Sequence, residues 1–529
     1  MKLKIILLFT FTFTFTFTFS IGQNLQHRPA DSNSMYVAKV TVNGTEALID
    51  IDGNYIVPPG IYEYINYDDF REGLCDVRKN GKYGFIDING TEVIPCIWDM
   101  AWAFKRGLAV VGRNNNGDLL RGMIDRTGKI VIPCKYAFCY FVESKDDKLL
   151  DVVVCVHGQY DLWDVRGNEL LKGVYSISNV CCNEMLRCST GNVRFFIDKS
   201  GNIKSKYYAY ADNFSNGFAK VEKFGGKCGY IDVDGEEHII GKYQSCGTFQ
   251  GQYAIVRNQN KEYGVINSSF EEIIPCMYDD IHRFRSKGPL FMDRFIASQN
   301  GKKGIIDQEN NVIVPFGAYE GFWDIDENEK VIVAETGHQY SRENSNVTTV
   351  SRSMHILLDE EGNKLTDKEY EYIGDFYNGY AYVKLDDKYG LINSKGEEVI
   401  PCKYHFDGSI SEFVDNGVVA IKNDDKYGLL SLSGEQIIPY EYDNIYSFNE
   451  GLAAVENKRK IGAIDTNGNI VIPTQWREPV AQYPRFHGGR LPVCEWSQET
   501  GWKYGYIGLD GDLVIPYKFD KVSAFISIE

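Results

Sequence analysis

The sequence predicts an all-β protein made of tandem repeats of about 39 residues, and three observations support this prediction. First, one unit recurs along nearly the whole chain. Second, its apolar runs are four to six residues long and are bounded by Gly, Asn and Asp, which is typical of strands. Third, 43% of the 529 residues are hydrophobic and 14% are aromatic. This composition supplies enough apolar surface for packed cores and excludes disorder of the whole chain.

The amino terminus has the layout of a secretory signal peptide. Two lysines precede an apolar stretch over 5–19, and the small residues Ser20 and Gly22 follow it. The stretch is shorter than the roughly 20 residues of a membrane-spanning helix, and no later segment predicts such a helix. We therefore expect a signal peptide over 1–22 and a short segment over 23–35. The mature protein is expected in the periplasm, at the cell surface or outside the cell.

The repeat is clearest from Lys82 to Pro95, which reads Lys-Tyr-Gly-Phe-Ile-Asp, a turn that ends in Gly90, and then Val-Ile-Pro. Nine copies keep the glycine of Lys-Tyr-Gly, and four degenerate copies keep only the hairpin pattern, which gives 13 copies over 36–529. The nine repeat glycines are Gly84, Gly122, Gly229, Gly264, Gly304, Gly390, Gly428, Gly462 and Gly505.

Each copy is predicted to be a three-stranded antiparallel meander. The first strand is an Ala-Val run such as 108–111, the second is Tyr-Gly-Phe-Ile-Asp, and the third is Val-Ile-Pro, with tight turns between them. We expect the proline to end the third strand, because it cannot donate to a ladder. A glycine inside a strand is costly unless something approaches it closely, so we expect an aromatic ring of the neighbouring unit to pack over it.

These residues resemble the WG-repeat (KWG) family, found chiefly in bacteria. Its repeat reads Lys-Trp/Tyr-Gly-aromatic-Ile-Asp, a Gly turn, Val-Ile-Pro and then Phe-x-x-Gly-Leu-Ala. Tyrosine stands in place of the family's tryptophan at Tyr83, Tyr263, Tyr389, Tyr427 and Tyr504. The resemblance implies a β-rich repeat architecture. It implies no general enzymatic activity, cofactor or ligand.

The arrangement of the copies is predicted to be an open, solenoid-like stack. Thirteen units exceed the four to eight blades typical of one propeller. The array begins with a strand at 36–40 and ends after one at 513–516, so we expect no unit to be shared between the two ends. The alternative is two β-propellers with a division near 331–365.

The 13 cysteines leave at least one thiol unpaired, because their number is odd. Four share the position after Ile-Pro, which suits a small core residue repeated by duplication. These four are Cys96, Cys134, Cys276 and Cys402. Cys181, Cys182 and Cys188 lie close together, and a disulfide from one of them, with Cys155 as a candidate partner, stays open. No Cys-x-x-Cys occurs, so we expect no zinc site.

No motif in the sequence predicts catalysis. The eight histidines share no unit position, and neither a nucleophile elbow nor a phosphate-binding loop is found. Turns such as 50–53 resemble fragments of calcium loops but lack the remaining ligands, so we interpret them as hairpin turns. We therefore expect no catalytic residues, no cofactor, no metal and no enzyme. An enzyme would need a pocket in the degenerate copies from Asp161 to Asp198.

Three copies carry extra residues in the turn between their first and second strands, at 112–119, 336–353 and 496–502. Insertions at one edge of a repeat array often mark its binding face, although the same turn is also the most exposed and tolerant point. Two of these insertions supply the candidate binding residues. They are His338, Tyr340, Arg342, Trp496 and Trp502.

The net charge of −17 argues against a nucleic-acid partner, because phosphates would be repelled. We expect a non-catalytic, exported scaffold that binds another protein through an acidic surface and its long turns. The alternative is a glycan-binding module of the cell envelope that uses exposed members of the 35 tyrosines and 30 phenylalanines. Aromatics that recur at one unit position are also expected to form the core between units.

Overall fold

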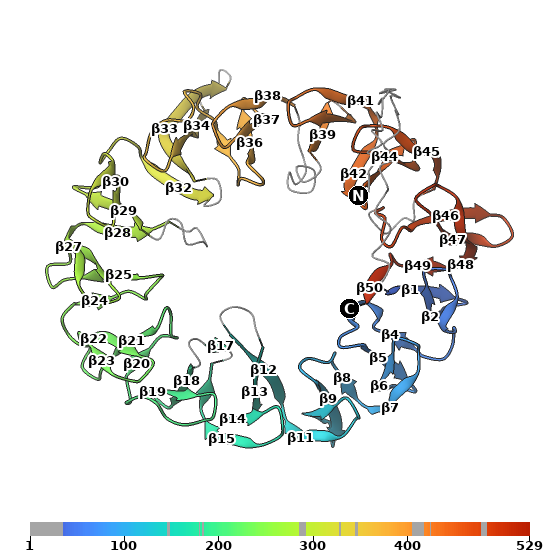
Figure 1. Cartoon of the computed structure of the whole chain (residues 1–529), viewed down its shortest axis with the longest axis horizontal. Helices are drawn as coiled ribbons and strands as arrows, with labels where there is room; N and C mark the ends of the chain where they lie inside the picture. The colour runs from blue at the N-terminus through green and yellow to red at the C-terminus, as the bar shows by residue number, and fades with distance from the viewer. Residues whose placement is uncertain are drawn as a thin grey trace, which may run out of the picture.

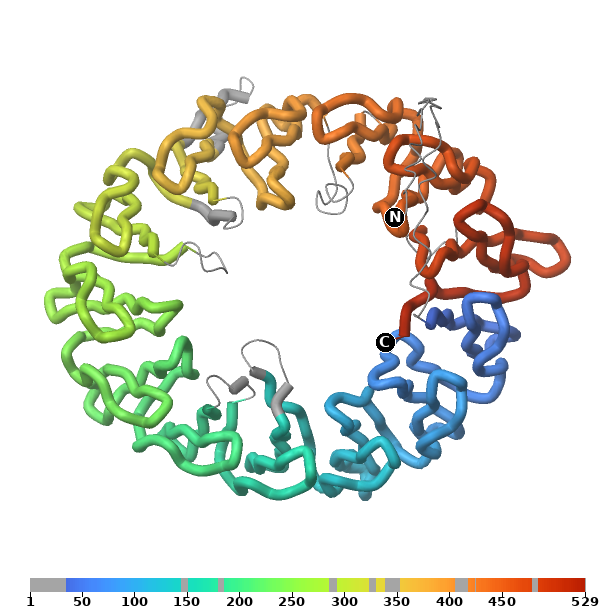
Figure 2. Tube along the Cα trace, in the orientation of Figure 1, coloured from blue at the N-terminus to red at the C-terminus, as the bar shows by residue number. Residues whose placement is uncertain are grey.

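The structure, a computed structural model, contains 13 β-sheets that lie side by side in a closed ring (Figures 1 and 2). It describes residues 35–144, 149–178, 180–181, 185–284, 293–326, 330–343, 348–404, 417–423, 425–477 and 484–528. The all-β repeat architecture is confirmed, and the open stack is wrong. A propeller arrangement forms instead, as in the alternative expectation, but it is one ring of 13 blades and not two propellers divided near 331–365. Over the described ranges, no helix is long and apolar enough to cross a membrane.

The blades are numbered here along the chain. Blade 1 holds β1 (Met35–Val42), β2 (Thr45–Asp50), β3 (Tyr55–Val57), β49 (Lys521–Val522) and β50 (Ile526–Ile528). Blade 2 holds β4 (Tyr64–Ile65), the 3-10 helix η1 (Tyr67–Asp69), β5 (Leu74–Lys79), β6 (Lys82–Asp87) and β7 (Glu92–Trp98). Blade 3 holds β8 (Met100–Ala101), β9 (Leu108–Asn115), β10 (Asp118–Asp125) and β11 (Ile130–Tyr136). Blade 4 holds β12 (Phe138–Ser144), β13 (Leu149–His157), β14 (Gln159–Asp164), β15 (Glu169–Val174) and β17 (Val180–Cys181).

The next five blades follow the same order. Blade 5 holds β16 (Ser176–Ile177), β18 (Met185–Thr190) and β19 (Val193–Asp198). Blade 6 holds β20 (Tyr210–Ala211), β21 (Phe218–Glu222), β22 (Cys228–Asp232) and β23 (Glu237–His238). Blade 7 holds β24 (Ser245–Cys246), β25 (Tyr253–Arg257), β26 (Tyr263–Asn267) and β27 (Glu272–Tyr278). Blade 8 holds β28 (Asp280–Arg283), β29 (Arg294–Gln299), β30 (Lys302–Asp307) and β31 (Val312–Val314), and blade 9 holds β32 (Gly321–Asp326), β33 (Val331–Glu343) and β34 (Thr348–Asp359).

Four blades complete the ring. Blade 10 holds β35 (Tyr372–Ile373), β36 (Tyr380–Leu385), β37 (Lys388–Asn393) and β38 (Glu398–Tyr404). Blade 11 holds β39 (Val418–Asn423), β40 (Lys426–Ser431) and β41 (Gln436–Tyr442). Blade 12 holds β42 (Asn444–Asn449), β43 (Leu452–Asn457), β44 (Lys460–Asp465) and β45 (Ile470–Trp476). Blade 13 holds β46 (Leu491–Ser497), β47 (Gly501–Ile507) and β48 (Leu513–Phe519).

Most blades have one strand more than the three expected, and the additional strand is short and lies toward the centre of the ring. Strand β8 is an example, since Met100 and Ala101 pair with Gly112 and Val111 of β9. At the other edge of the sheet, strands such as β7, β11 and β27 follow the rim (Figure 1). The expected three-stranded meander therefore corresponds to the outer three strands of a four-stranded blade.

The repeat proline does not end its strand as expected. In blade 2, Phe85 pairs with Ile94 and Tyr83 pairs with Trp98, so three residues of β7, including Pro95, bulge opposite Gly84 alone. A bulge tolerates proline because its residues do not donate to the ladder. A Cβ on Gly84 would lie 2.5 Å from the carbonyl oxygen of Ile94. The close neighbour of the repeat glycine is thus the bulged outer strand of its own blade. The prediction that an aromatic ring of the neighbouring unit packs over this glycine is wrong.

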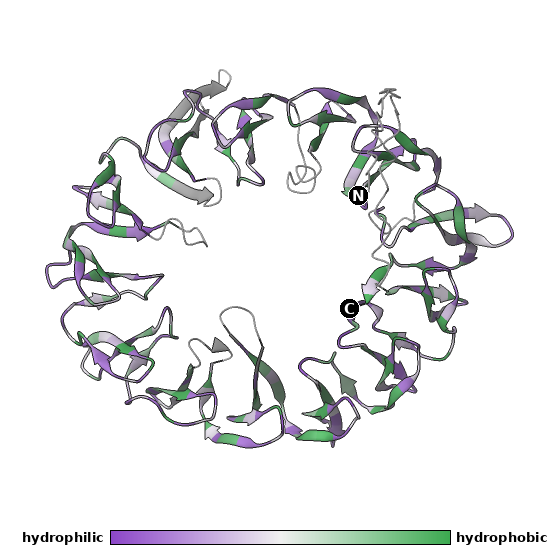
Figure 3. Cartoon of the chain, viewed as in Figure 1, coloured by the Kyte–Doolittle hydropathy of each residue, from purple (hydrophilic) through white to green (hydrophobic). Residues whose placement is uncertain are grey.

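Hydrophobic residues recur in every blade (Figure 3). Their buried side chains form clusters between adjacent blades. At the junction of blades 2 and 3, the inner-turn Phe104 packs edge-on against Phe85, with ring centroids 4.8 Å apart. Phe214 packs against Phe196 in the same way, at 4.9 Å. Aromatic residues at repeated unit positions thus form the core between blades, because an antiparallel sheet alone cannot bury both of its faces.

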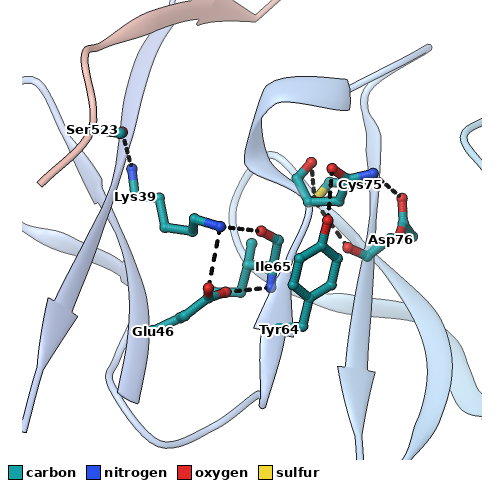
Figure 4. A network of polar contacts seen from close by, with 8 residues as sticks. Lys39, Glu46, Tyr64, Ile65, Cys75, Asp76 and Ser523 are labelled. Carbon is teal, nitrogen blue, oxygen red and sulfur yellow. Dashed lines mark hydrogen bonds and ion pairs between the residues drawn. The ribbon is translucent and has the colours of Figure 1, made fainter. Parts of the chain in front are cut away.

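The two ends of the chain share blade 1, contrary to the expectation from the sequence. Val40 pairs with Val522 and Tyr36 pairs with Ser527, so β1 lies between β2 on one side and β49 and β50 on the other. The backbone nitrogen of Lys39 donates to the Ser523 hydroxyl at 3.0 Å, and its Nζ atom lies 3.2 Å from a carboxylate oxygen of Glu46 (Figure 4). The pairing of β1 with β49 and β50 and the hydrogen bond between Lys39 and Ser523 close the ring.

Contacts across the closure repeat those between consecutive blades. A Cβ on Gly90 in blade 2 would meet the carbonyl oxygen of Ile56 in blade 1, at 2.5 Å. A Cβ on Gly53, at the same turn of blade 1, would meet the side chain of Ile515 in blade 13, at 3.1 Å. Blade 13 therefore precedes blade 1 around the ring just as blade 1 precedes blade 2.

Candidate functional site

The hairpin β46–β47 is longer than the hairpin formed by the corresponding strands of most blades, and it projects outward from the ring (Figure 2). Trp496 and Trp502 lie directly opposite each other on its two strands. Cross-strand partners point to the same face of a hairpin, so the two indoles are neighbours. Trp496 is 55% exposed and Trp502 is 40% exposed. The insertion at 496–502 thus places two large aromatic side chains at the surface.

These tryptophans line a cleft of about 470 Å³ between blades 12 and 13. Its other walls come mainly from the end of β45 in blade 12 and from β48 in blade 13. They include Lys460, Gln475, Trp476, Arg477, Glu495 and Tyr517. The cleft therefore gathers three of the seven tryptophans of the chain.

Trp476 differs from its counterparts because it is only partly buried. The residue that ends the outer strand is almost fully covered in other blades, for example Trp98, Tyr136, Tyr278 and Phe519. The indole Nε1 of Trp476 is itself covered and has no hydrogen-bond partner within the part of the chain that the structure describes. The cleft thus exposes part of a ring that elsewhere belongs to the core.

Two cations lie in the cleft. Lys460 donates from Nζ to the backbone carbonyl of Gln475 at 2.9 Å. The guanidinium carbon of Arg477 lies 5.6 Å from the ring centre of Trp502, which is a cation–π distance. This contact helps to orient the Trp502 indole and leaves the guanidinium N–H groups at the cleft.

Tyr517 supplies a neutral hydroxyl. Burial, followed by the charges of Glu495 and Cys494, raises the pKa of Tyr517 to about 12. Since this pKa lies above the ordinary value of 10, the phenol keeps its proton at physiological pH and can donate a hydrogen bond. The cleft therefore combines three aromatic faces, two cations, a carboxylate and a phenol, which is a set of groups suited to binding by stacking and hydrogen bonding.

The other candidate residues lie elsewhere in the ring. His338, Tyr340 and Arg342 are on β33 in blade 9, paired with Ser353, Ser351 and Thr349 of β34. Their side chains lie outside the description. Over its described residues, the insertion thus continues the hairpin β33–β34 beyond a register shift between Glu335 and Gly337. It is not brought together with the tryptophans of blade 13 (Figure 1).

Sequence reasoning found only Trp496 and Trp502 among the cleft residues, and it missed the others, among them Lys460, Trp476, Arg477 and Tyr517. They come from ordinary repeat positions and not from an insertion. The sequence did hold a signal for Arg477. The residue directly after the outer strand is acidic in other copies, as at Asp99, Asp443 and Asp520, whereas it is basic here.

The acidic turns use their carboxylates within the fold. Asp50 accepts hydrogen bonds at Oδ1 from the backbone nitrogens of Asp52 and Asn54, at 3.0 and 2.8 Å, and at Oδ2 from the Asn54 amide. Side chains that bond their own turn in this way stabilise hairpins. In the described ranges, no group of three or more His, Cys, Asp or Glu side chains is placed to hold a metal ion.

One disulfide joins blades 6 and 7, between Cys228 and Cys246. Neither residue was singled out by the sequence, because they occupy different unit positions. Cys155 lies opposite Cys139 in register and is a buried free thiol, and so is Cys188, one of its three candidate partners. The side chains of Cys181 and Cys182 lie outside the described residues. The four cysteines after Ile-Pro are half-buried free thiols, and burial raises the pKa of Cys96 to about 11.

Comparison with known families identifies the repeat. The model of the WG containing repeat matches ten stretches that cover more than half of the chain. These are 48–83, 83–116, 122–146, 195–228, 229–261, 263–302, 357–389, 389–427, 427–460 and 504–527. The chain belongs to the WG-repeat family. The WG-repeat glycines are those that face the bulged outer strands described above.

No curated protein sequence matches this WG-repeat chain. Among solved structures, a eukaryotic initiation factor aligns at 11% identity over 69% of this chain and 95% of its own, with a TM-score of 0.28. BamB from Moraxella catarrhalis aligns at 9% identity over 56% of this chain and 94% of its own, with a TM-score of 0.24. The tricorn protease aligns at 11% identity over 94% and 58%, with a TM-score of 0.20. At such scores these likenesses carry no argument about function.

Proposed function

We propose that this WG-repeat ring is a non-catalytic, exported carbohydrate-binding protein whose site is the cleft between blades 12 and 13. The observation that supports the proposal is the pair of exposed indoles, Trp496 and Trp502, beside the partly exposed Trp476. The C–H face of a pyranose ring packs on the electron-rich face of an indole, and contacts of this type contribute about 1 kcal/mol each. A volume near 470 Å³ lies within the range of small-ligand sites.

Replacing Trp502 by Ala is expected to weaken saccharide binding at least about tenfold, because a stacking surface and the support of Arg477 are lost together. The measurement is binding of the mature chain to a saccharide array, followed by titration calorimetry with the sugars retained. Trp102→Ala is the matched control, since Trp102 is 49% exposed but lies in blade 3. An equal loss in both variants, or no loss in Trp502→Ala, would contradict the site.

Export is the second part of the proposal. The N-terminal layout over 1–22 supports it, and so does the Cys228–Cys246 disulfide, since such bonds persist in oxidising compartments.

We expect the secreted protein to begin at Gln23 and to carry Cys228 and Cys246 as a crosslinked pair. Breaking this bond with Cys228→Ala is expected to cost about 3 kcal/mol at the junction of blades 6 and 7, because a loop of 18 residues is released. Peptide mass spectrometry after alkylation of free thiols in denaturant identifies the first residue of the secreted chain and shows whether Cys228 and Cys246 are crosslinked. Denaturant unfolding of Cys228→Ala measures the loss of stability. A retained Met1 with both thiols alkylated would show that the chain is not exported.

A protein-interaction scaffold is the second candidate function. Its supporting observation is the hairpin β33–β34, whose strands of 13 and 12 residues extend well beyond those of the other described blades. A variant with this hairpin shortened to a four-residue turn separates the two functions. Unchanged saccharide binding with loss of a protein partner would favour the scaffold.

A further inference from the structure

One position of the repeat forms the same ion pair in several blades. The residue directly after the outer strand is an aspartate that pairs with the lysine two residues before the repeat glycine. Lys82 and Asp99 lie 2.5 Å apart, and Lys426 and Asp443 do so as well. Lys503 and Asp520 repeat the contact at 2.5 Å. Each of these three lysines therefore has a carboxylate partner in the connection to the next blade.

The same aspartate also holds the next hairpin. Asp99 accepts a hydrogen bond from the backbone nitrogen of Asn114 at 2.9 Å, and Asp443 accepts one from that of Lys458 at 2.6 Å. The lysine contacts lower the pKa of both carboxyl groups, so both are ionised at neutral pH. An acid at this position thus satisfies one lysine and one backbone N–H group.

At the cleft, the position that holds an aspartate in those blades holds an arginine instead. Lys460 is the lysine two residues before the repeat glycine Gly462, and the residue after β45 is Arg477. Within the described residues, neither cation has a carboxylate partner within ion-pair distance. Glu495 is the one carboxylate among the residues that line the cleft. The site therefore carries excess positive charge in a chain whose net charge is −17.

We infer that the saccharide bound in this cleft is anionic, with a carboxylate or sulfate group held by Arg477 and Lys460 and its sugar ring stacked on Trp496 and Trp502. This inference rests on the proposed carbohydrate-binding function. An arginine fork binds a planar carboxylate through two parallel hydrogen bonds. Glu495 and Tyr517 remain available to accept from and donate to sugar hydroxyl groups.

The placement of the indoles favours a sugar over a nucleotide. Trp496 and Trp502 are cross-strand partners, so their indoles lie on one face of a hairpin and not on two opposing walls of a slot. Two indoles on one face can each accept a pyranose ring of the same oligosaccharide.

The test uses the mature full-length chain and two probes that differ only in charge, an oligogalacturonate and its fully methyl-esterified form. An oligomannuronate and a heparin oligosaccharide extend the set to a second uronate and to sulfate. We expect at least one of the acidic oligosaccharides to bind about tenfold more tightly than the uncharged, esterified oligogalacturonate. We also expect this preference to shrink as the salt concentration is raised. Titration calorimetry measures both effects.

Arg477→Asp is the decisive variant, because it restores the acid that other blades carry and so preserves the fold. The new aspartate is expected to pair with Lys460, and the preference for the acidic probe is expected to disappear. Lys422→Asp is the control, since Lys422 lies outside the cleft, over the ring of Tyr427 in blade 11. Unfolding midpoints of both variants check that the ring is intact.

Each outcome decides between the two proposals. Binding that needs Trp502 but is equal for acidic and esterified probes, or unaffected by Arg477→Asp, overturns the anionic ligand and leaves the carbohydrate-binding function standing. Binding of no saccharide overturns both. Displacement of the acidic probe by adenosine monophosphate at equal concentration would show that the cleft selects anions without selecting sugars, and would overturn the inference.

Discussion

Removal of residues 521–529 is expected to open the ring. The deletion takes away β49, β50 and the inner-turn Phe525, which is buried and packs against Tyr506 with centroids 4.9 Å apart. It also removes the backbone hydrogen bond from Ser523 to the Lys39 carbonyl, at 2.9 Å. Loss of a buried phenylalanine alone costs about 3–5 kcal/mol, and the edge of β1 is left without a partner.

The expected result is a larger radius of gyration in solution scattering and rapid amide hydrogen exchange in β1, with the distant blades unchanged. Local readouts are needed because the blades of a repeat protein do not unfold as one unit. Phe525→Ala is a milder form of the same change. Lys521→Ala is the control, because that side chain is exposed on β49. A truncated chain as compact as the full one would contradict closure through β49 and β50.

Replacing Gly84 by Ala is expected to destabilise blade 2 by about 3 kcal/mol, the upper part of the range for overpacking. The new Cβ would lie 2.5 Å from the Ile94 carbonyl oxygen and 2.7 Å from the Cys96 nitrogen. Both are backbone atoms of the bulge around Pro95, so no side-chain rotation relieves the contact. The bulge must unfold locally, and the pairing of β6 with β7 must weaken.

Hydrogen exchange of β6 and β7, together with denaturant unfolding, measures this cost. Gly321→Ala is the matched control, because its Cβ would meet only the flexible carboxylate of Glu335, at 3.1 Å. Equal stability of the two variants would mean that the repeat glycine is not required by the bulge.

Much of the blade could be predicted from sequence because its signals are local. The Ala-Val runs, the Asp-x-x-Gly turns and the repeat glycines such as Gly84 predict the hairpins of the outer strands. The inner strands escaped prediction because a strand such as β8 has two residues, too few to show any alternation. The role of Pro95 escaped because the three-residue bulge around it preserves pairing on both sides.

Closure could not be predicted because it depends on geometry accumulated over the whole chain. Strands β49 and β50 have two and three residues, too few to show any alternation, so nothing local in the sequence predicts that they pair with β1 at the other end of the chain. Some residues of the candidate site likewise have a local signal in the sequence, and others come together only through the fold. Trp496 and Trp502 stand out as an insertion. Arg477 joins them only because blades 12 and 13 are adjacent, and Tyr517 joins them because β48 pairs with β47.

The sharing of blade 1 between the two ends of the chain also sets an order of events in synthesis and transport. Every junction between consecutive blades can form as soon as the next blade leaves the ribosome or the membrane channel. The junction between blades 13 and 1 must wait for the last residues, because β49 and β50 complete the first sheet. Until then β1 presents an unpaired edge, which is a template for association with other chains. The final step of biogenesis is therefore an intramolecular capture of the C-terminus, and its rate sets how long the nascent arc is vulnerable to aggregation.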